Sequence, residues 1–313
     1  MKAKSIQKII NQRFNAWVKS ITDENVKRLV QENTIMTGGA IVSMLLNEPV
    51  NDFDFYFRNK ETTFAVAKYY VDQFVKENPN HKSGHDVTYN NDGLSVFVPI
   101  EVRLENDGRV HVVAKSAGIA AAGNNNTYRY FELDPRHGAS DYIDDLVDAA
   151  NQMKKNEKMS FAPIFLSSNA ITLTNDVQIV IRFYGDPEKI HENYDFIHCT
   201  NYWTSWNNEV VLNAKALESI LTRELIYVGS KYPIASLCRI RKFLDRGWYI
   251  TAGQILKISM QISELNLNNF DILEDQLTGV DAAYFMDIIA KLKEKDAQAI
   301  DKSYLGKLID EIF

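Results

Sequence analysis

A glycine pair and an aspartate pair, joined by one apolar segment, are the residues in this sequence best suited to chemistry. Gly38 and Gly39 open a segment whose apolar spacing predicts a helix that ends near Pro49. Glycines at a helix start leave backbone N–H groups bare at the positive end of the helix dipole, where a phosphate binds well. Asp52 and Asp54 are two residues apart on a predicted strand, so both side chains project to one face. Two negative charges so close together repel each other, and a bound divalent cation would relieve this repulsion. The segment therefore predicts a site for a phosphate-bearing ligand and a metal ion.

The order of these features resembles a known superfamily. A glycine pair, a helix ending in Leu45-Leu46 and an Asp-x-Asp strand are similar to the head of the polymerase-β-like nucleotidyltransferases, most closely the CCA-adding and poly(A) polymerase branch. The chain also resembles phage-encoded nucleotidyltransferases, and the likeness covers about residues 34 to 58 and 169 to 250. It departs from the branch at Ile41-Val42-Ser43, where the branch has Val-Arg-Asp.

The resemblance implies a metal-dependent nucleotidyltransferase. Such an enzyme moves NMP from an NTP, here ATP or CTP by preference, to an acceptor hydroxyl and releases pyrophosphate. The favoured acceptor is an RNA 3′ end such as that of tRNA. A protein or small-molecule acceptor is an alternative, and so is a catalytically retired head that serves as a binding or antitoxin module.

The resemblance also implies two Mg²⁺ ions, with Mn²⁺ as a substitute, held by three carboxylates. In this chain they would be Asp52, Asp54 and Asp195, with Asp195 on a neighbouring strand of the sheet. Glu101 is the runner-up for the third position. Because Arg103 lies beside it, a structural ion pair is an equal interpretation of Glu101.

Further residues are expected to contact the nucleotide. Backbone groups of Gly38 and Gly39 would meet the phosphates, together with side chains that carry a hydroxyl or a positive charge, namely Ser43, Lys231, Arg239 and Lys242. Ser43 fits a solvent-facing position equally well, and the basic residues also fit an ordinary solvated helix face. The sequence leaves both interpretations open.

Aromatic residues near the expected domain boundary have two interpretations as well. Tyr202, Trp203 and Trp206 could stack on a base. Aromatic residues close to a domain junction commonly belong to a core instead. His198, which follows Asp195 closely, could orient a carboxylate or be a structural histidine.

Composition limits the class of protein. Hydrophobic residues at 45% and charged residues at 24% are typical of a globular chain, and 35 basic against 41 acidic residues give a net charge of −6. Any nucleic-acid contact must therefore be local. No apolar run is long enough to cross a membrane and the N-terminus lacks a signal-sequence pattern, so we expect a cytoplasmic protein without membrane contact. Two cysteines and six histidines show no zinc-site spacing, and the oligomeric state is not set by the sequence.

The elements that must position the site alternate between strands and helices, which predicts an α+β fold. We expect a helical lead-in at 1–33 and a nucleotidyltransferase head at 34–212, with a mixed sheet flanked by helices and a β-rich insertion at about 78–165. An all-helical C-terminal domain should occupy 213–313.

Periodicity predicts the individual elements. Strands are expected at 35–37, 52–57, 86–89, 94–104, 109–114, 170–174, 177–183 and 194–197. Two helices are expected within 5–32, the second capped by Thr22 or Asp23, followed by helices at 41–46, 62–75, 141–153, 217–225, 234–244, 251–262, 281–292 and 303–312, and a short one after Pro187.

Overall fold

A computed structural model describes residues 1–78, 84–88, 95–113, 119–120, 161–267, 269, 272–273 and 276. The described residues divide into two compact units. The first takes in those of Met1–Asn124, Val147–His191 and His198–Ile220, and the second takes in those of Asn125–Leu146, Glu192–Ile197 and Leu221–Phe313. Each unit is considered by itself below.

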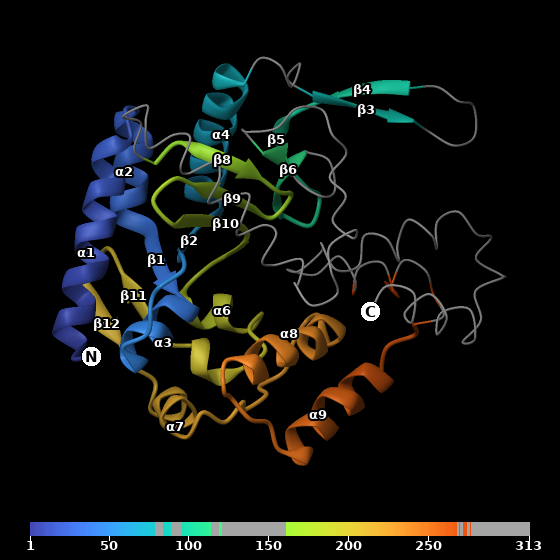
Figure 1. Ribbon diagram of the computed structural model, residues 1–313. Helices are drawn as coiled ribbons and strands as arrows, with labels where there is room; N and C mark the ends of the chain where they lie inside the picture. Colours follow the sequence, from blue (N-terminus) through green and yellow to red (C-terminus); the bar gives the residue numbers. More distant parts are fainter. Residues whose placement is uncertain are drawn as a thin grey trace. The chain divides into compact units, whose positions relative to one another are not determined.

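Helices and strands follow one another along the first unit (Figure 1). Its helices are α1 (Ala3–Ser20), α2 (Glu24–Asn33), α3 (Gly39–Leu46), α4 (Lys60–Glu77), α6 (Pro187–His191) and most of α7 (Ala214–Thr222), with a 3-10 turn η2 (Ile197–Cys199) at its edge. Its strands are β1 (Thr34–Thr37), β2 (Phe53–Phe57), β3 (Gly84–Thr88), β4 (Ser95–Pro99), β5 (Glu101–Leu104), β6 (Val110–Val113), β7 (Ile119–Ala120), β8 (Pro163–Leu166), β9 (Ala170–Leu173), β10 (Val177–Tyr184), β11 (Tyr202–Thr204) and β12 (Glu209–Val211). The expected α+β class is confirmed.

One mixed sheet organises this unit. Among the described residues it has eight strands in the order β12-β11-β1-β2-β10-β9-β8-β7. β2 and β10 run parallel, and the other neighbours are antiparallel. The predicted hairpin is confirmed, because β9 and β10 pair across Asn175 and Asp176, which both have positive φ.

Helices α1 and α4 cover one face of the sheet. Figure 1 shows α1 along the end formed by β1, β11 and β12, and α4 along the end formed by β8 and β10. The ring of Trp17 stacks on that of Phe55 with centroids 4.9 Å apart, and its Nε1 donates to the hydroxyl of Tyr70 in α4 over 2.7 Å. Apolar residues at helical spacing in α1 therefore join both helices and the sheet in one core.

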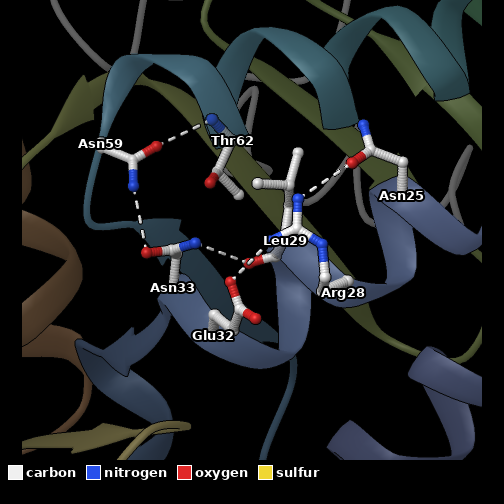
Figure 2. Close-up of polar contacts among 7 residues, drawn as sticks. All are labelled: Asn25, Arg28, Leu29, Glu32, Asn33, Asn59 and Thr62. Carbon is white, nitrogen blue, oxygen red and sulfur yellow. Dashed lines mark hydrogen bonds and ion pairs between the residues drawn. The ribbon is translucent and has the colours of Figure 1, made fainter.

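A polar joint holds α2 to the start of α4, as Figure 2 shows. The side chain of Asn59 caps α4 by accepting from the backbone N–H of Thr62 over 2.9 Å, and its amide donates to Asn33 over 3.0 Å. Asn33 in turn donates to the carbonyl of Leu29 over 3.0 Å, which satisfies an end of α2. Of the two caps predicted for α2, Thr22 and Asp23, the structure has Asp23, whose side chain accepts from Val26 N over 3.0 Å.

The expected β-rich insertion is described in part. β3 pairs with β4 and β5 pairs with β6, each as a separate two-stranded ladder. The single strand predicted at 94–104 is wrong, since it divides after Pro99, whose missing N–H cannot extend a ladder. Residues 89, 94 and 114 of the predicted strands, and the helix predicted at 141–153, lie outside the described residues.

The described part of the second unit contains α8 (Pro233–Asp245) and α9 (Ala252–Ser263), close to the predicted helices. α7 ends at Thr222, earlier than predicted, where Arg223 takes a positive φ of 56°. The helices predicted at 281–292 and 303–312 lie outside the described residues. Among the helices that the structure describes, none combines the length and apolar character needed to cross a membrane.

Candidate functional site: a polar row across the sheet

The glycine pair forms the turn between β1 and α3. Gly38 has φ 98° and ψ −152°, a conformation that favours glycine because a side chain would clash. Its N–H donates to the carbonyl of Cys199 over 3.2 Å. At Gly39 the helix begins, and a Cβ built there would meet no atom within 4 Å. Gly38 is thus required by the backbone, whereas Gly39 faces open space.

The aspartate pair lies at the start of β2. Asp52 is exposed and precedes the strand, and Asp54 is half-buried within it. Mg²⁺ is commonly bound through one or two carboxylates together with waters, so this pair suits such an ion. In the part of the chain that the structure describes, no three His, Cys, Asp or Glu side chains form a group that could hold a metal ion.

The sheet register places Asp54 within a row of polar side chains. Met36 pairs with Phe55, so the next pair along these antiparallel strands sets Thr37 opposite Asp54. On the far side of β1, Thr37 pairs with Tyr202. On the far side of β2, Asp54 pairs with Gln178, which pairs with Thr172 in β9.

These five residues, Tyr202, Thr37, Asp54, Gln178 and Thr172, are called the polar row below. Residues directly opposite each other share one face of a sheet, and their neighbours along the strands, such as Met36 and Phe55, belong to the core on the other face. At about 4.8 Å between strands, the row runs for roughly 19 Å. Thr37 is fully buried, whereas the other four members are half-buried, and their hydroxyl, carboxylate and amide groups can form hydrogen bonds with a polar ligand.

Helix α6 contributes a histidine to the same face. His191 Nε2 lies 2.9 Å from the hydroxyl of Thr37, which donates to the carbonyl oxygens of Cys199 over 3.2 Å and Asn201 over 3.0 Å. A threonine hydroxyl has one hydrogen, and because carbonyl oxygens can only accept, that hydrogen points to the carbonyls. The hydroxyl oxygen is then the acceptor for His191, which donates from Nε2. Burial lowers the pKa of His191 to about 4, so the ring is neutral at pH 7 with its proton on Nε2.

Tyr202 closes one end of the row. Its ring lies against that of His191 with centroids 5.7 Å apart. Burial raises the pKa of the Tyr202 hydroxyl, and the charges of Glu188 and Glu209 raise it further. At neutral pH this hydroxyl is therefore a hydrogen-bond donor as well as an acceptor.

Asp195 is placed differently from the prediction. It lies in a bend and not on a strand of the sheet, because its segment bonds to a later part of the second unit. Val228 N donates to the carbonyl of Asp195 over 2.9 Å, and Phe196 forms an isolated bridge with Tyr227. Asp195 belongs to the second unit, whereas Asp52 and Asp54 belong to the first.

Two predicted site residues bind each other. The carboxylate of Asp195 accepts from the guanidinium of Arg239 in α8, and the side chains are 6% and 19% exposed. Burial and the charge of Asp195 together raise the pKa of the nearby Tyr227 hydroxyl to about 12. The charge of Arg239 is thus matched within the protein.

The remaining basic and hydroxyl candidates are spread out. Ser43 is half-buried in α3, and its carbonyl accepts from Glu48 N over 2.8 Å. Lys231 is exposed with its ammonium 5.7 Å from the ring of Tyr232, and Lys242 is exposed on α8. The exposure of both lysines matches the solvated interpretation.

Contacts also distinguish the two interpretations of Glu101 and of the aromatic residues. Glu101 forms an ion pair with Arg103 at an N–O distance of 2.6 Å, as the structural interpretation of Glu101 expects. Trp203 is 1% exposed in the core, and Trp206 lies under the guanidinium of Arg58, 5.0 Å from its ring centroid. His198 is buried, which lowers its pKa to about 3.

Sequence reasoning missed most of the polar row. Thr37 adjoins the glycine pair at the end of a predicted strand, and His191 belongs to no motif. The alternation Val177-Gln178-Ile179 in a strand places Gln178 on the face opposite the core, and this signal could have found it.

Residues 8–223 match the family model described as Gabija anti-defense 2 family protein. The match spans more than half of the chain. The chain belongs to this family.

One curated relative supports the Gabija anti-defense 2 assignment. It is "Gabija anti-defense 2" of Bacillus phage SPbetaL7, which is 25% identical over 128 residues. The matched region makes up 40% of this chain and 32% of the relative, so the chain spans about a third of the relative's length. No solved structure matches the chain.

Membership in the Gabija anti-defense 2 family corrects the nucleotidyltransferase interpretation. The family model that matches is not one of a nucleotidyltransferase, so the assignment to that superfamily and to tRNA nucleotidyl transfer is wrong. The magnesium and ATP-binding properties lose the support of that resemblance. Transfer to a protein or small molecule, and a retired or antitoxin module, gain no support either.

Proposed function

We propose that this chain counteracts an anti-phage defence, the Gabija system, in the cytoplasm of an infected bacterium. The family match over residues 8–223 carries the proposal, and the name and phage origin of the relative support it. The matched range contains the whole polar row and both aspartates.

We propose the polar row as the site that performs this function. Its four half-buried members carry side chains that can bind a ligand, on the sheet face opposite the core formed with α1 and α4. We further propose that Asp52 and Asp54 bind Mg²⁺ or Mn²⁺, and that the chain acts as an enzyme whose reaction is not assigned. The nucleotide and RNA partners expected from the sequence stay predictions.

An infection assay tests the function. Bacteria carrying the Gabija system, with and without the chain expressed, are challenged with a phage that the system restricts. We expect the chain to raise plaque formation to the level of cells without the system. Unchanged plaque formation, with the chain expressed and folded, would refute the proposal. Cells that lack the system provide the control, since the chain should not alter their plaque counts.

Two variants test the polar row as the functional site. Asp54→Asn and Gln178→Ala should abolish the gain in plaques while leaving the melting temperature within a few degrees, because both side chains are half-buried at the surface of the sheet. Gln73→Ala in α4, which changes another half-buried glutamine of the first unit, is the matched control and should keep the gain. Calorimetric titration of Mg²⁺ into the wild type and Asp54→Asn tests the metal, and thermal shift with ATP, CTP and RNA tests the other partners.

A further inference from the structure

Apolar side chains are exposed unusually densely in the second unit and the end of α7. Eight of the ten large hydrophobic side chains that are exposed among the described residues fall between positions 221 and 260. They are Leu221, Val228, Leu237, Leu244, Tyr249, Ile255, Leu256 and Met260. Scattered apolar side chains are normal on a surface, whereas a contiguous group of them is typical of an interaction site.

Helix α9 is amphipathic, but its polar side faces its own unit and its apolar side is exposed. Its inward side carries two glutamines around the buried Ile258. Gln254 accepts from the backbone N–H of Tyr227 over 3.0 Å, and Gln261 donates to the carbonyl of Ser230 over 2.6 Å. Polar groups thus fix the helix to its own unit, while most of its apolar residues other than Ile258 are exposed.

The outward residues form stripes at helical spacing. On α9, Leu256 and Met260 are four residues apart and each 60% exposed. On α8, which packs against α9, Leu237 and Leu244 are exposed with Arg241 between them at the same helical spacing. α9 therefore presents apolar side chains where an ordinary surface helix presents polar ones, and α8 presents apolar and charged side chains together.

The charge of these helices is opposite to that of the chain. α8 and α9 together contain four basic residues, Arg239, Arg241, Lys242 and Lys257, and one acidic residue, Asp245, although the whole chain has a net charge of −6. Arg239 pairs with Asp195, and at the exposed positions of the two helices the basic Arg241, Lys242 and Lys257 outnumber the acidic Asp245.

We propose that α8 and α9 form a docking surface for a protein partner whose own surface is acidic around an apolar centre. The positive charge selects an acidic partner and opposes a second copy, because two such surfaces would bring like charges together. An anionic membrane fits less well, since membrane-surface helices carry a polar face rich in Lys and Arg, whereas the polar face of α9 is built of glutamines bonded to its own unit.

This inference rests on the proposed function, which supplies the partner to be tested, the purified Gabija proteins. The family match ends at residue 223, before α8, so it does not account for this surface. Binding is measured by biolayer interferometry with the full chain immobilised. We expect the doubly substituted variant Leu256→Asp/Met260→Asp to bind at least about 30-fold more weakly, because the substitutions place carboxylates at the apolar centre. Arg241→Glu should weaken binding and reduce its dependence on salt.

A matched control comes from the first unit. Leu104 in β5 is 47% exposed, as is Leu244 in α8, so Leu104→Asp and Leu244→Asp make the same change at equal exposure. Leu244→Asp should weaken binding, and Leu104→Asp should bind as the wild type does. Equal affinity of all variants would overturn the docking surface.

Other occupants of the surface give different results. If the C-terminal part of the chain covers α9, the double variant has a lower melting temperature than the wild type. If a second copy of the chain covers α9, the double variant has a lower mass in sedimentation than the wild type. Wild type that binds vesicles of anionic lipid but not the Gabija proteins identifies a membrane. Each of these results overturns the proposal. A chain that rescues phage yet binds no Gabija protein refutes the docking surface alone, whereas a chain that rescues no phage refutes the proposed function.

Discussion

Removal of Arg239 should destabilise the second unit strongly and leave the first unit unchanged. Arg239→Ala leaves the carboxylate of Asp195, 6% exposed, without its cationic partner. Breaking a buried pair by removing one member costs about 3–5 kcal/mol. Where exchange proceeds through unfolding of the unit, this corresponds to roughly 100- to 5,000-fold faster hydrogen exchange of its protected amides.

Hydrogen exchange followed by mass spectrometry resolves the effect by peptide. Peptides of α8 and of the segment around Tyr227 should lose protection, whereas peptides of β1, β2 and β10 serve as an internal control. The double variant Asp195→Asn/Arg239→Gln removes both charges and should recover much of the protection. Unchanged protection in Arg239→Ala would refute the pair as a structural element, and would favour the phosphate contact expected from the sequence.

Three further predictions concern the first unit. Gly38→Ala should lower the free energy of unfolding by about 1–3 kcal/mol, because Gly38 has a φ of 98°. Gly39→Ala, whose Cβ meets open space, should raise the free energy of unfolding by up to about 1 kcal/mol. Urea unfolding measures both changes. Tyr70→Phe takes the acceptor from the buried Trp17 N–H and should cost about 1–3 kcal/mol in the same assay. His191 has a folded pKa of about 4 against 6.5 unfolded, so the unfolded chain binds the extra proton first. This residue should lower the stability by at most about 3 kcal/mol as pH drops from 6.5 to 4, in addition to the contribution of the buried His198. His191→Gln keeps a donor near Thr37 and should flatten that part of the pH profile; an equally steep profile would contradict the assignment.

Local pattern was sufficient to predict most elements of the first unit. The spacing of Ile6, Ile10 and Phe14 predicts α1, and the capping side chain of Asp23 marks the start of α2. The turn residues Asn175 and Asp176 predict the β9–β10 hairpin. These signals lie within a few residues of one another, so the sequence displays them directly.

Features that depend on distant partners were not predicted. The segment at Asp195 has the alternation of a strand, but its backbone bonds go to Ile226 and Val228, some thirty residues away along the chain. The polar row joins five strands whose order in the sheet differs from their order in the sequence. No local spacing contains that order, so Gln178 and Thr172 could not be linked to Asp54.

The same distinction explains why a short motif pointed to the wrong family. Gly38 is explained by the backbone, which needs a glycine at φ 98° to turn from β1 into α3, whatever the chain does. A helix that returns the chain to an antiparallel neighbour then places the start of β2, and any polar residue there, beside that turn. A glycine pair followed by Asp-x-Asp thus indicates a β–α–β connection, and the chemistry of the site depends on the side chains that the adjacent strands contribute. Here they add Tyr202, Gln178 and Thr172, and it is in these side chains together with Asp54, rather than in the motif alone, that the chemistry of the family should be sought.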